Sequence, residues 1–123
     1  MRSCTSLSTL VLVIGLGSAG LDQVQAQSVK IVGIGASSCA RFLQETEGNA
    51  RAEREYFAWA QGYMTGLLIR APAGRDEGLD LAPPSFPLLK QAEFLRTFCV
   101  RDQSADFSDG VNSLYRTLRA PPG

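Results

Sequence analysis

Residues 50–69 carry the stretch ARAEREYFAWAQGYMTGLLI, which decides the fold class of the chain. The stretch contains no proline, and charged residues crowd its first turns between positions 51 and 55. Its apolar residues recur at the spacing of one helix face. They are Ala52, Tyr56, Trp59, Ala60, Tyr63, Met64, Leu67 and Leu68. We therefore expect an amphipathic helix from Ala50 to Ile69 with one continuous apolar face.

Two glycines, Gly62 and Gly66, lie inside this expected helix. A glycine in a helix costs about 1 kcal/mol relative to alanine, and the spacing of four residues places both on one side. We expect another helix or chain segment to approach closely there and to compensate for this cost. Trp59 and Tyr63, together with the two glycines, then form the packing part of the helix. The charges nearby exclude the membrane version of a G-x-x-x-G pair.

Short helices are expected before residue 50. The β-branched stretch Val29–Ile34, followed by a Gly-x-Gly turn, predicts an extended segment or edge strand. Ser37 and Ser38 are good N-cap residues for a first helix that runs through Leu43. Gly48 and Asn49 then end that helix.

Two more helices are expected after a polar loop at 71–84. Ser85 can cap a third helix that runs to about Val100, with Pro87 near its first turn. Its inner face is Leu88, Gln91 or Ala92, Leu95, and Phe98 or Cys99. Asp106 starts a fourth helix with apolar residues again at helical spacing, namely Phe107, Val111, Leu114 and Leu118. The sequence therefore predicts an all-α fold, a four-helix orthogonal array with a short N-terminal extended segment.

The first 26 residues have the layout of a secretory signal peptide. Arg2 precedes an apolar run at 7–16, and Val24-Gln25-Ala26 fits the small-x-small cleavage rule. The run is too short to span a bilayer, which needs roughly 20 apolar residues. We expect cleavage after Ala26, with Ala19 as the second choice, which leaves one helical domain at 27–123. A G-x-G-x-x-G at 15–20 also matches a dinucleotide-binding turn, but the following helix and the remaining chain are too short for that fold.

Cleavage would leave two cysteines, Cys39 and Cys99, since Cys4 precedes the apolar run. An even number of cysteines in an exported protein suggests a disulfide. A metal site is the alternative, but two thiols with no histidine are half of a ligand set. We therefore predict a structural Cys39–Cys99 bridge and no metal site.

Composition excludes several functions. The 123 residues contain 12 Lys and Arg against 12 Asp and Glu, so there is no net charge to attract nucleic acid or anionic lipid. The absence of histidine removes the commonest general base. Candidate carboxylates lie two apart on a helix or in a loop, so no paired acid and base is expected. We expect no enzyme activity, no cofactor and no membrane insertion after signal cleavage.

The aromatic residues of the 50–69 helix indicate either contact with a protein partner or the filling of a small core. Phe57 lies off the main apolar face of the 50–69 helix, so we consider it a candidate contact. Arg75, Asp76 and Glu77 are further candidates in the 71–84 loop, because loops of this length are often functional. For the loop as a whole, a solvated connector is the interpretation that we favour over a functional one.

The order of these pieces resembles a group of small exported bacterial proteins, the HdeA-like and Rap/Tai-type immunity proteins. The resemblance rests on Gly33-Ile-Gly35, Ser38-Cys39, the Trp59-x-x-Gly62-Tyr63-x-x-Gly66 helix and a later helix ending in Cys99, and it covers residues 29–119. It implies a small, helical, disulfide-bonded domain in the periplasm or outside the cell. Its named members either neutralise a secreted toxin or protect unfolded periplasmic proteins against acid. We therefore expect a non-enzymatic binding protein of the immunity or inhibitor type. An acid-stress chaperone and a small structural protein of the envelope are the alternatives.

Overall fold

The computed structural model of the protein describes residues 30–120, which form five helical elements and no strand. The elements are η1 (Gly33–Ala36), a short 3₁₀ helix, followed by α1 (Cys39–Thr46), α2 (Ala50–Ile69), α3 (Leu88–Arg101) and α4 (Phe107–Arg119). The predicted all-α fold with four α-helices is confirmed. The predicted signal segment at 1–26 and the final residues 121–123 lie outside the described part of the chain.

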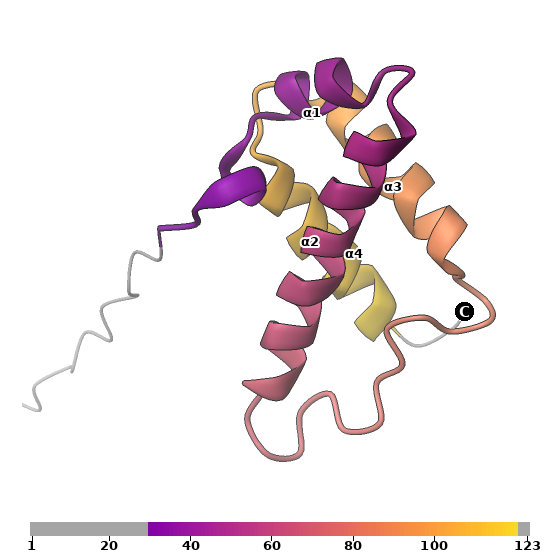
Figure 1. The fold of residues 1–123 in the computed structure, drawn as a ribbon. Helices are drawn as coiled ribbons and strands as arrows, with labels where there is room; N and C mark the ends of the chain where they lie inside the picture. The colour runs from indigo at the N-terminus through magenta and orange to yellow at the C-terminus, as the bar shows by residue number, and fades with distance from the viewer. Residues whose placement is uncertain (1–29, 121–123) are drawn as a thin grey trace, which may run out of the picture.

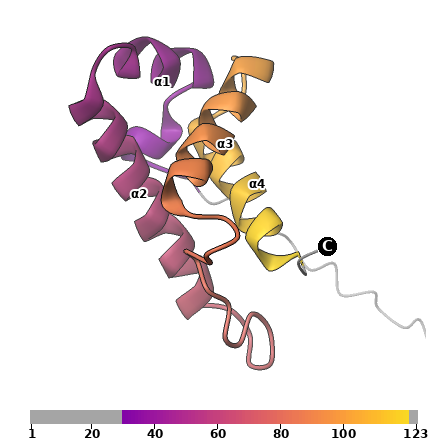
Figure 2. The same cartoon turned by 90° about the vertical axis from the view of Figure 1, so that its right-hand side faces the viewer.

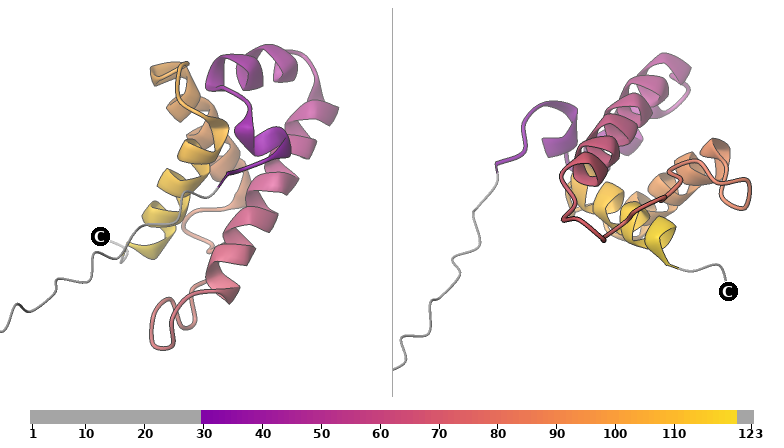
Figure 3. Two further views of the ribbon diagram at one scale, coloured as in Figure 1. Left: turned by 90° about the vertical axis from the view of Figure 1, so that its left-hand side faces the viewer. Right: turned by 90° about the horizontal axis from the view of Figure 1, so that it is seen from below.

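The helices form an array in which α1 crosses one end of the other three (Figures 1 and 2). Helices α2 and α3 each pack on α1 and on α4, but scarcely on each other. Seen from below, α2 and α3 diverge (Figure 3, right). On the opposite side of the molecule η1 lies between α2 and α4 (Figure 3, left). Helix α4 thus packs on both α2 and α3, while these two helices diverge from each other.

Side chains at the helix starts explain where three of the helices begin. The Ser38 hydroxyl accepts a hydrogen bond from the Arg41 amide at 3.2 Å, and the Asn49 side chain accepts one from the Ala52 amide at 3.1 Å. At α4, Asp106 and Asp109 form a reciprocal capping box. The bounds of α2 are those expected from the sequence, because Gly48 (φ +62°) turns the chain immediately before the Asn49 cap.

Phe107, the first residue of α4, lies at the centre of the core and is fully buried. Its ring centroid is 4.8 Å from that of Phe42, 5.0 Å from that of Tyr56 and 6.2 Å from that of Trp59. Aromatic rings at such separations and tilts attract one another beyond the area that they bury. One residue of α4 thus holds α1 and α2 together.

The predicted Cys39–Cys99 disulfide is confirmed, and both cysteines are fully buried. The bridge joins the first turn of α1 to the last turn of α3, which are 60 residues apart in the sequence. Backbone hydrogen bonds join the same region to the start of α4. The amides of Cys39 and Ala40 donate to the carbonyls of Ala105 and Gln103, at 2.8 and 3.0 Å, and the Phe107 amide donates to Ser37 at 2.8 Å.

One local prediction holds in part and another is wrong. Of the two alternatives for the stretch that ends at Ile34, the extended segment is observed at Val32 and the edge strand is not: Gly33 (φ +74°) turns the chain into η1, and no neighbouring strand is present among residues 30–120. Ser85 does not cap α3; Pro87 occupies the N-cap position without a side-chain hydrogen bond. Ser85 lies instead within a turn that the Phe86 amide closes onto the Pro83 carbonyl at 2.9 Å.

The expected close approach at Gly62 and Gly66 is also wrong. Both glycines face solvent, and a methyl group placed on either would meet no atom within 4 Å outside the helix itself. Among residues 30–120 the tightest packing against a glycine is at Gly35 in η1. A methyl group there would lie 2.0 Å from Cζ2 of Trp59, so the indole ring takes the place that a side chain at Gly35 would need.

Candidate functional site

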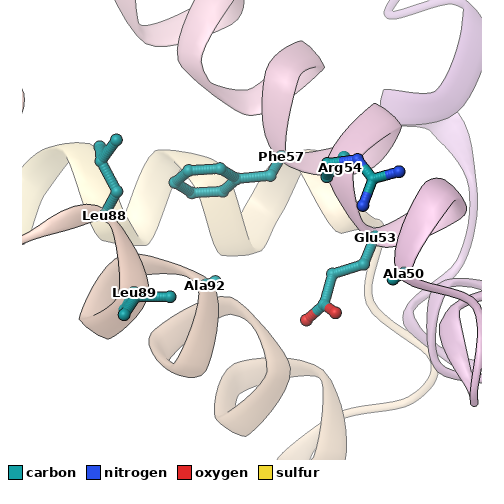
Figure 4. Close-up of a pocket in the computed structure, with 7 residues that line it drawn as sticks. All are labelled: Ala50, Glu53, Arg54, Phe57, Leu88, Leu89 and Ala92. Carbon is teal, nitrogen blue, oxygen red and sulfur yellow. The ribbon is translucent and has the colours of Figure 1, made fainter.

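The candidate site is an open apolar groove of about 390 Å³ between α2 and α3. Its lining comes from the first half of α2 and the first turns of α3 (Figure 4). The lining residues are Ala50, Glu53, Arg54, Phe57, Leu88, Leu89 and Ala92. A groove of this size falls within the range of sites that take a ligand or an inserted side chain. We call it the α2–α3 groove.

Phe57 is the central residue of this groove. Its ring extends from α2 across the gap towards Leu88 (Figure 4). Phe57 also lines a much smaller cavity of about 10 Å³, whose other walls include the core residues Phe42, Leu95 and Phe107. The ring therefore separates the core from the groove, with one side packed inward and the other open.

The Arg96 side chain links α3 to α1 and α2 near the groove. Its guanidinium donates to Glu53 Oε1 at 3.2 Å and to Thr46 Oγ1 at 3.4 Å, and it lies 5.7 Å from the centroid of the Phe42 ring. The Glu53 carboxylate extends towards α3 (Figure 4). Because both side chains are partly exposed, this ion pair contributes at most about 1 kcal/mol. Its main effect is therefore to hold the Glu53 side chain in place at the edge of the groove.

The loop candidates lie apart from the groove, and none of Arg75, Asp76 or Glu77 lines it. The side chain of Asp76 is only 8% exposed, because its carboxylate accepts hydrogen bonds from the Tyr115 hydroxyl at 2.9 Å and from Arg119 Nε. Burial, the largest single influence, raises the pKa of Asp76, but the hydrogen bonds and charge of these two α4 residues together lower it below the usual value. Asp76 thus fastens the loop to α4.

The neighbours of Asp76 have different surroundings. Arg75 and Glu77 are exposed, and the Glu77 carboxylate accepts a hydrogen bond from the Gly74 amide at 2.9 Å within the loop. Asp76 itself has a φ of +61°, a left-handed conformation that is uncommon for a residue with a side chain. The loop therefore has a defined conformation around Asp76, and the charged side chains of Arg75 and Glu77 are exposed to solvent.

Trp59 and Tyr63 lie on the side of α2 that packs against η1 and α4. Both are half-buried against the core, with their rings stacked at 5.0 Å between centroids. The Tyr63 hydroxyl donates to Asn112 Oδ1 of α4 at 3.2 Å. These two aromatic residues therefore serve packing, as expected, while Phe57 is the aromatic residue of α2 that opens into the groove.

The sequence did not identify the α3 wall of the groove. Leu88 was expected on the inner face of α3, yet it remains partly exposed, and Leu89 is 84% exposed. Adjacent residues lie about 100° apart around a helix, so Leu89 falls to one side of the inner face that was expected to begin at Leu88. An apolar residue outside that face was a signal of an apolar surface. Within residues 30–120 no group of three or more Cys, Asp or Glu is placed to hold a metal ion, and no helix is long and apolar enough to cross a membrane.

Comparison with protein-family models, curated proteins and solved structures found no match to the chain. The resemblance to the HdeA-like and immunity-protein group therefore stays a prediction from the motifs. The confirmed disulfide and helix order agree with what it implies about the fold.

Proposed function

We propose that the chain is an exported, non-enzymatic binding protein that sequesters a protein partner in the manner of an immunity protein or inhibitor. The α2–α3 groove is the proposed contact surface, and its open Phe57 ring is the observation that carries the proposal. The predicted signal peptide supports the exported location, in the periplasm or outside the cell.

The groove suits an amphipathic helix of the partner better than a polar ligand. Its walls are mainly apolar, and the charged groups Glu53, Arg54 and Arg96 lie at or beside its edge. Helix-in-groove binding uses apolar anchors at every third or fourth residue, with polar contacts around them. We infer that one or two large apolar side chains of the partner pack against Phe57 and Leu88.

The test begins with crosslinking capture of a partner from an envelope extract by the disulfide-bonded protein at neutral pH. The candidate partner is then purified and its affinity is measured for the wild type and for Phe57→Ala and Leu88→Ala. We expect each substitution to weaken binding at least about tenfold, which is 1.4 kcal/mol. Ile69→Ala is the matched control, since Ile69 is an exposed apolar residue of α2 outside the groove. Full affinity in both groove variants, with their circular dichroism unchanged, would exclude the groove as the contact surface.

An acid-stress chaperone is the second candidate, favoured by the position of two ion pairs. Glu53–Arg96 joins α2 to α3, and Asp76–Arg119 joins the loop to α4. Protonation of the carboxylates in strong acid removes both links and leaves the arginines charged. Capture of many proteins only at about pH 3 would favour this function, and no capture at either pH would favour a structural role in the envelope.

A further inference from the structure

Helix α3 carries exposed apolar residues near both of its ends. Leu89 is 84% exposed and Val100 is 59% exposed. These residues are separated by three turns of helix, or about 16 Å along the axis, and therefore lie on one face. In Figure 1 α3 lies at the right-hand edge of the bundle, and Figure 2 looks onto this side.

Two opposite charges lie on the same face between the apolar ends. Glu93 and Arg96 follow Leu89 at intervals of four and seven residues, so the four side chains form one strip along α3. Glu93 is exposed and makes no salt bridge within residues 30–120. Arg96 is paired with Glu53 but remains 38% exposed, and its guanidinium has donors to spare for a second carboxylate.

The strip is complementary to itself when two copies of α3 lie antiparallel. The pair Leu89 and Val100 and the pair Glu93 and Arg96 share one midpoint, between Phe94 and Leu95. A two-fold axis through that point brings Leu89 of each copy against Val100 of the other. The same axis brings Glu93 of each copy against Arg96 of the other.

We propose that the α3 strip (Leu89, Glu93, Arg96 and Val100) is the contact surface between two copies of this chain. The contact is isologous, as is usual in symmetric dimers. Equal numbers of acidic and basic residues, 12 of each, leave no net repulsion between the copies. A single helix face buries less area than a standard protein interface, so the dimer is a weak one that forms at high concentration.

The strip overlaps the α2–α3 groove at Leu89, and its other three residues lie outside the groove lining. A protein partner whose contacts extend over Leu89 would therefore compete with the second copy. The dimer does not depend on the proposed function, because it requires no other protein and is measured on the purified chain alone.

Charge reversal in two separate variants gives a direct test by sedimentation equilibrium. Glu93→Arg places only positive charges at the centre of its own dimer, and Arg96→Glu places only negative ones. We expect each variant alone to dimerise more than about tenfold more weakly than the wild type, because like charges are brought together. An equimolar mixture should recover the dimer, since every central pair is then opposite in charge.

Leu89→Asp is a second, independent variant, because Leu89 is too exposed for its loss to affect folding. It should also weaken the dimer more than about tenfold. Ile69→Asp, which changes an exposed apolar residue on α2, should leave dimerisation unchanged. If Arg96→Glu fails to fold, Glu93→Arg and Leu89→Asp still test the proposal. A wild-type protein that stays monomeric at concentrations of hundreds of micromolar overturns the proposal. A dimer that is weakened by neither Glu93→Arg nor Leu89→Asp also overturns it.

Discussion

Substitution of Gly35 by alanine tests the packing of η1 on α2. Gly35 is buried, and its added methyl group would lie 2.0 Å from Cζ2 and 2.1 Å from Cη2 of Trp59. Carbon atoms in contact are about 3.5–4.0 Å apart, so the indole ring would have to move by about 1.5 Å or more. That movement disturbs the stacking of Trp59 on Tyr63.

The expected loss of stability follows from these two effects. Overpacking of a well-packed site costs about 1–3 kcal/mol, and loss of an aromatic pair adds up to about 1 kcal/mol. We expect Gly35→Ala to lower the free energy of unfolding by about 2–3 kcal/mol. For a domain of this size that corresponds to a fall in Tm of roughly 10 °C or more.

Urea denaturation followed by fluorescence measures this change directly, because Trp59 is the only tryptophan in the chain. Gly62→Ala is the matched control, since its methyl group would face solvent and meet no atom within 4 Å. The control should raise the free energy of unfolding by up to about 1 kcal/mol, from the better helix propensity of alanine. A Gly35→Ala protein as stable as the wild type, with an unchanged Trp59 emission spectrum, would refute the packing described for η1.

Three further predictions concern the bridge, the core and the loop. Replacing Cys39 and Cys99 by alanine should lower the free energy of unfolding by about 4 kcal/mol, because the bridge closes a loop of 60 residues; urea curves without reductant measure it, and a loss below about 1 kcal/mol would contradict it. Phe107→Ala should cost about 3–5 kcal/mol by the same assay, since the residue is fully buried among aromatic rings; a stability within about 1 kcal/mol of wild type would show that the core does not depend on it. The pKa of Asp76 is lower in the folded than in the unfolded state, so Asp76 contributes stability above the ordinary carboxyl pKa of about 3.9, and this is lost as pH falls through the folded-state value. Asp76→Asn should therefore reduce stability at pH 7 and make the stability less dependent on pH in acid. Urea midpoints over a pH series measure this, and equal pH dependence in both proteins would contradict the role of Asp76 in holding the loop on α4.

The sequence predicted those features of the fold that depend on neighbours in the chain. Helix α2 was expected with the bounds observed, since its apolar period, its missing proline and the Gly48 turn are all local. The start of α4 after its Asp106 N-cap and the Cys39–Cys99 pair were also expected, the first from a capping residue and the second from a count of cysteines.

Features that depend on distant segments could not be predicted in this way. The side chain at Asp76 is held by Tyr115, which is 39 residues away, and nothing near either residue indicates the other. The close contact of Gly35 with Trp59 likewise joins two elements that are distant in the sequence. Close packing was therefore expected at Gly62 and Gly66 within α2, where it does not occur. The α2–α3 groove could not be predicted in full for the same reason. Phe57 was selected because it lies off the main apolar face, but its opposite wall depends on the angle between α2 and α3.

The backbone hydrogen bonds between the start of α1 and the α3–α4 turn have a consequence for hydrogen exchange. The first amides of a helix ordinarily have no partner within the helix and exchange rapidly with solvent. Here the amides of Cys39 and Ala40 donate to carbonyls of the α3–α4 turn, beside the buried disulfide. We expect them to exchange as slowly as amides in the middle of α2. Because both halves of each bond are main chain, a side-chain substitution at the exposed Gln103 should leave its bond with Ala40 intact, whereas proline at Ala40 would remove the donor.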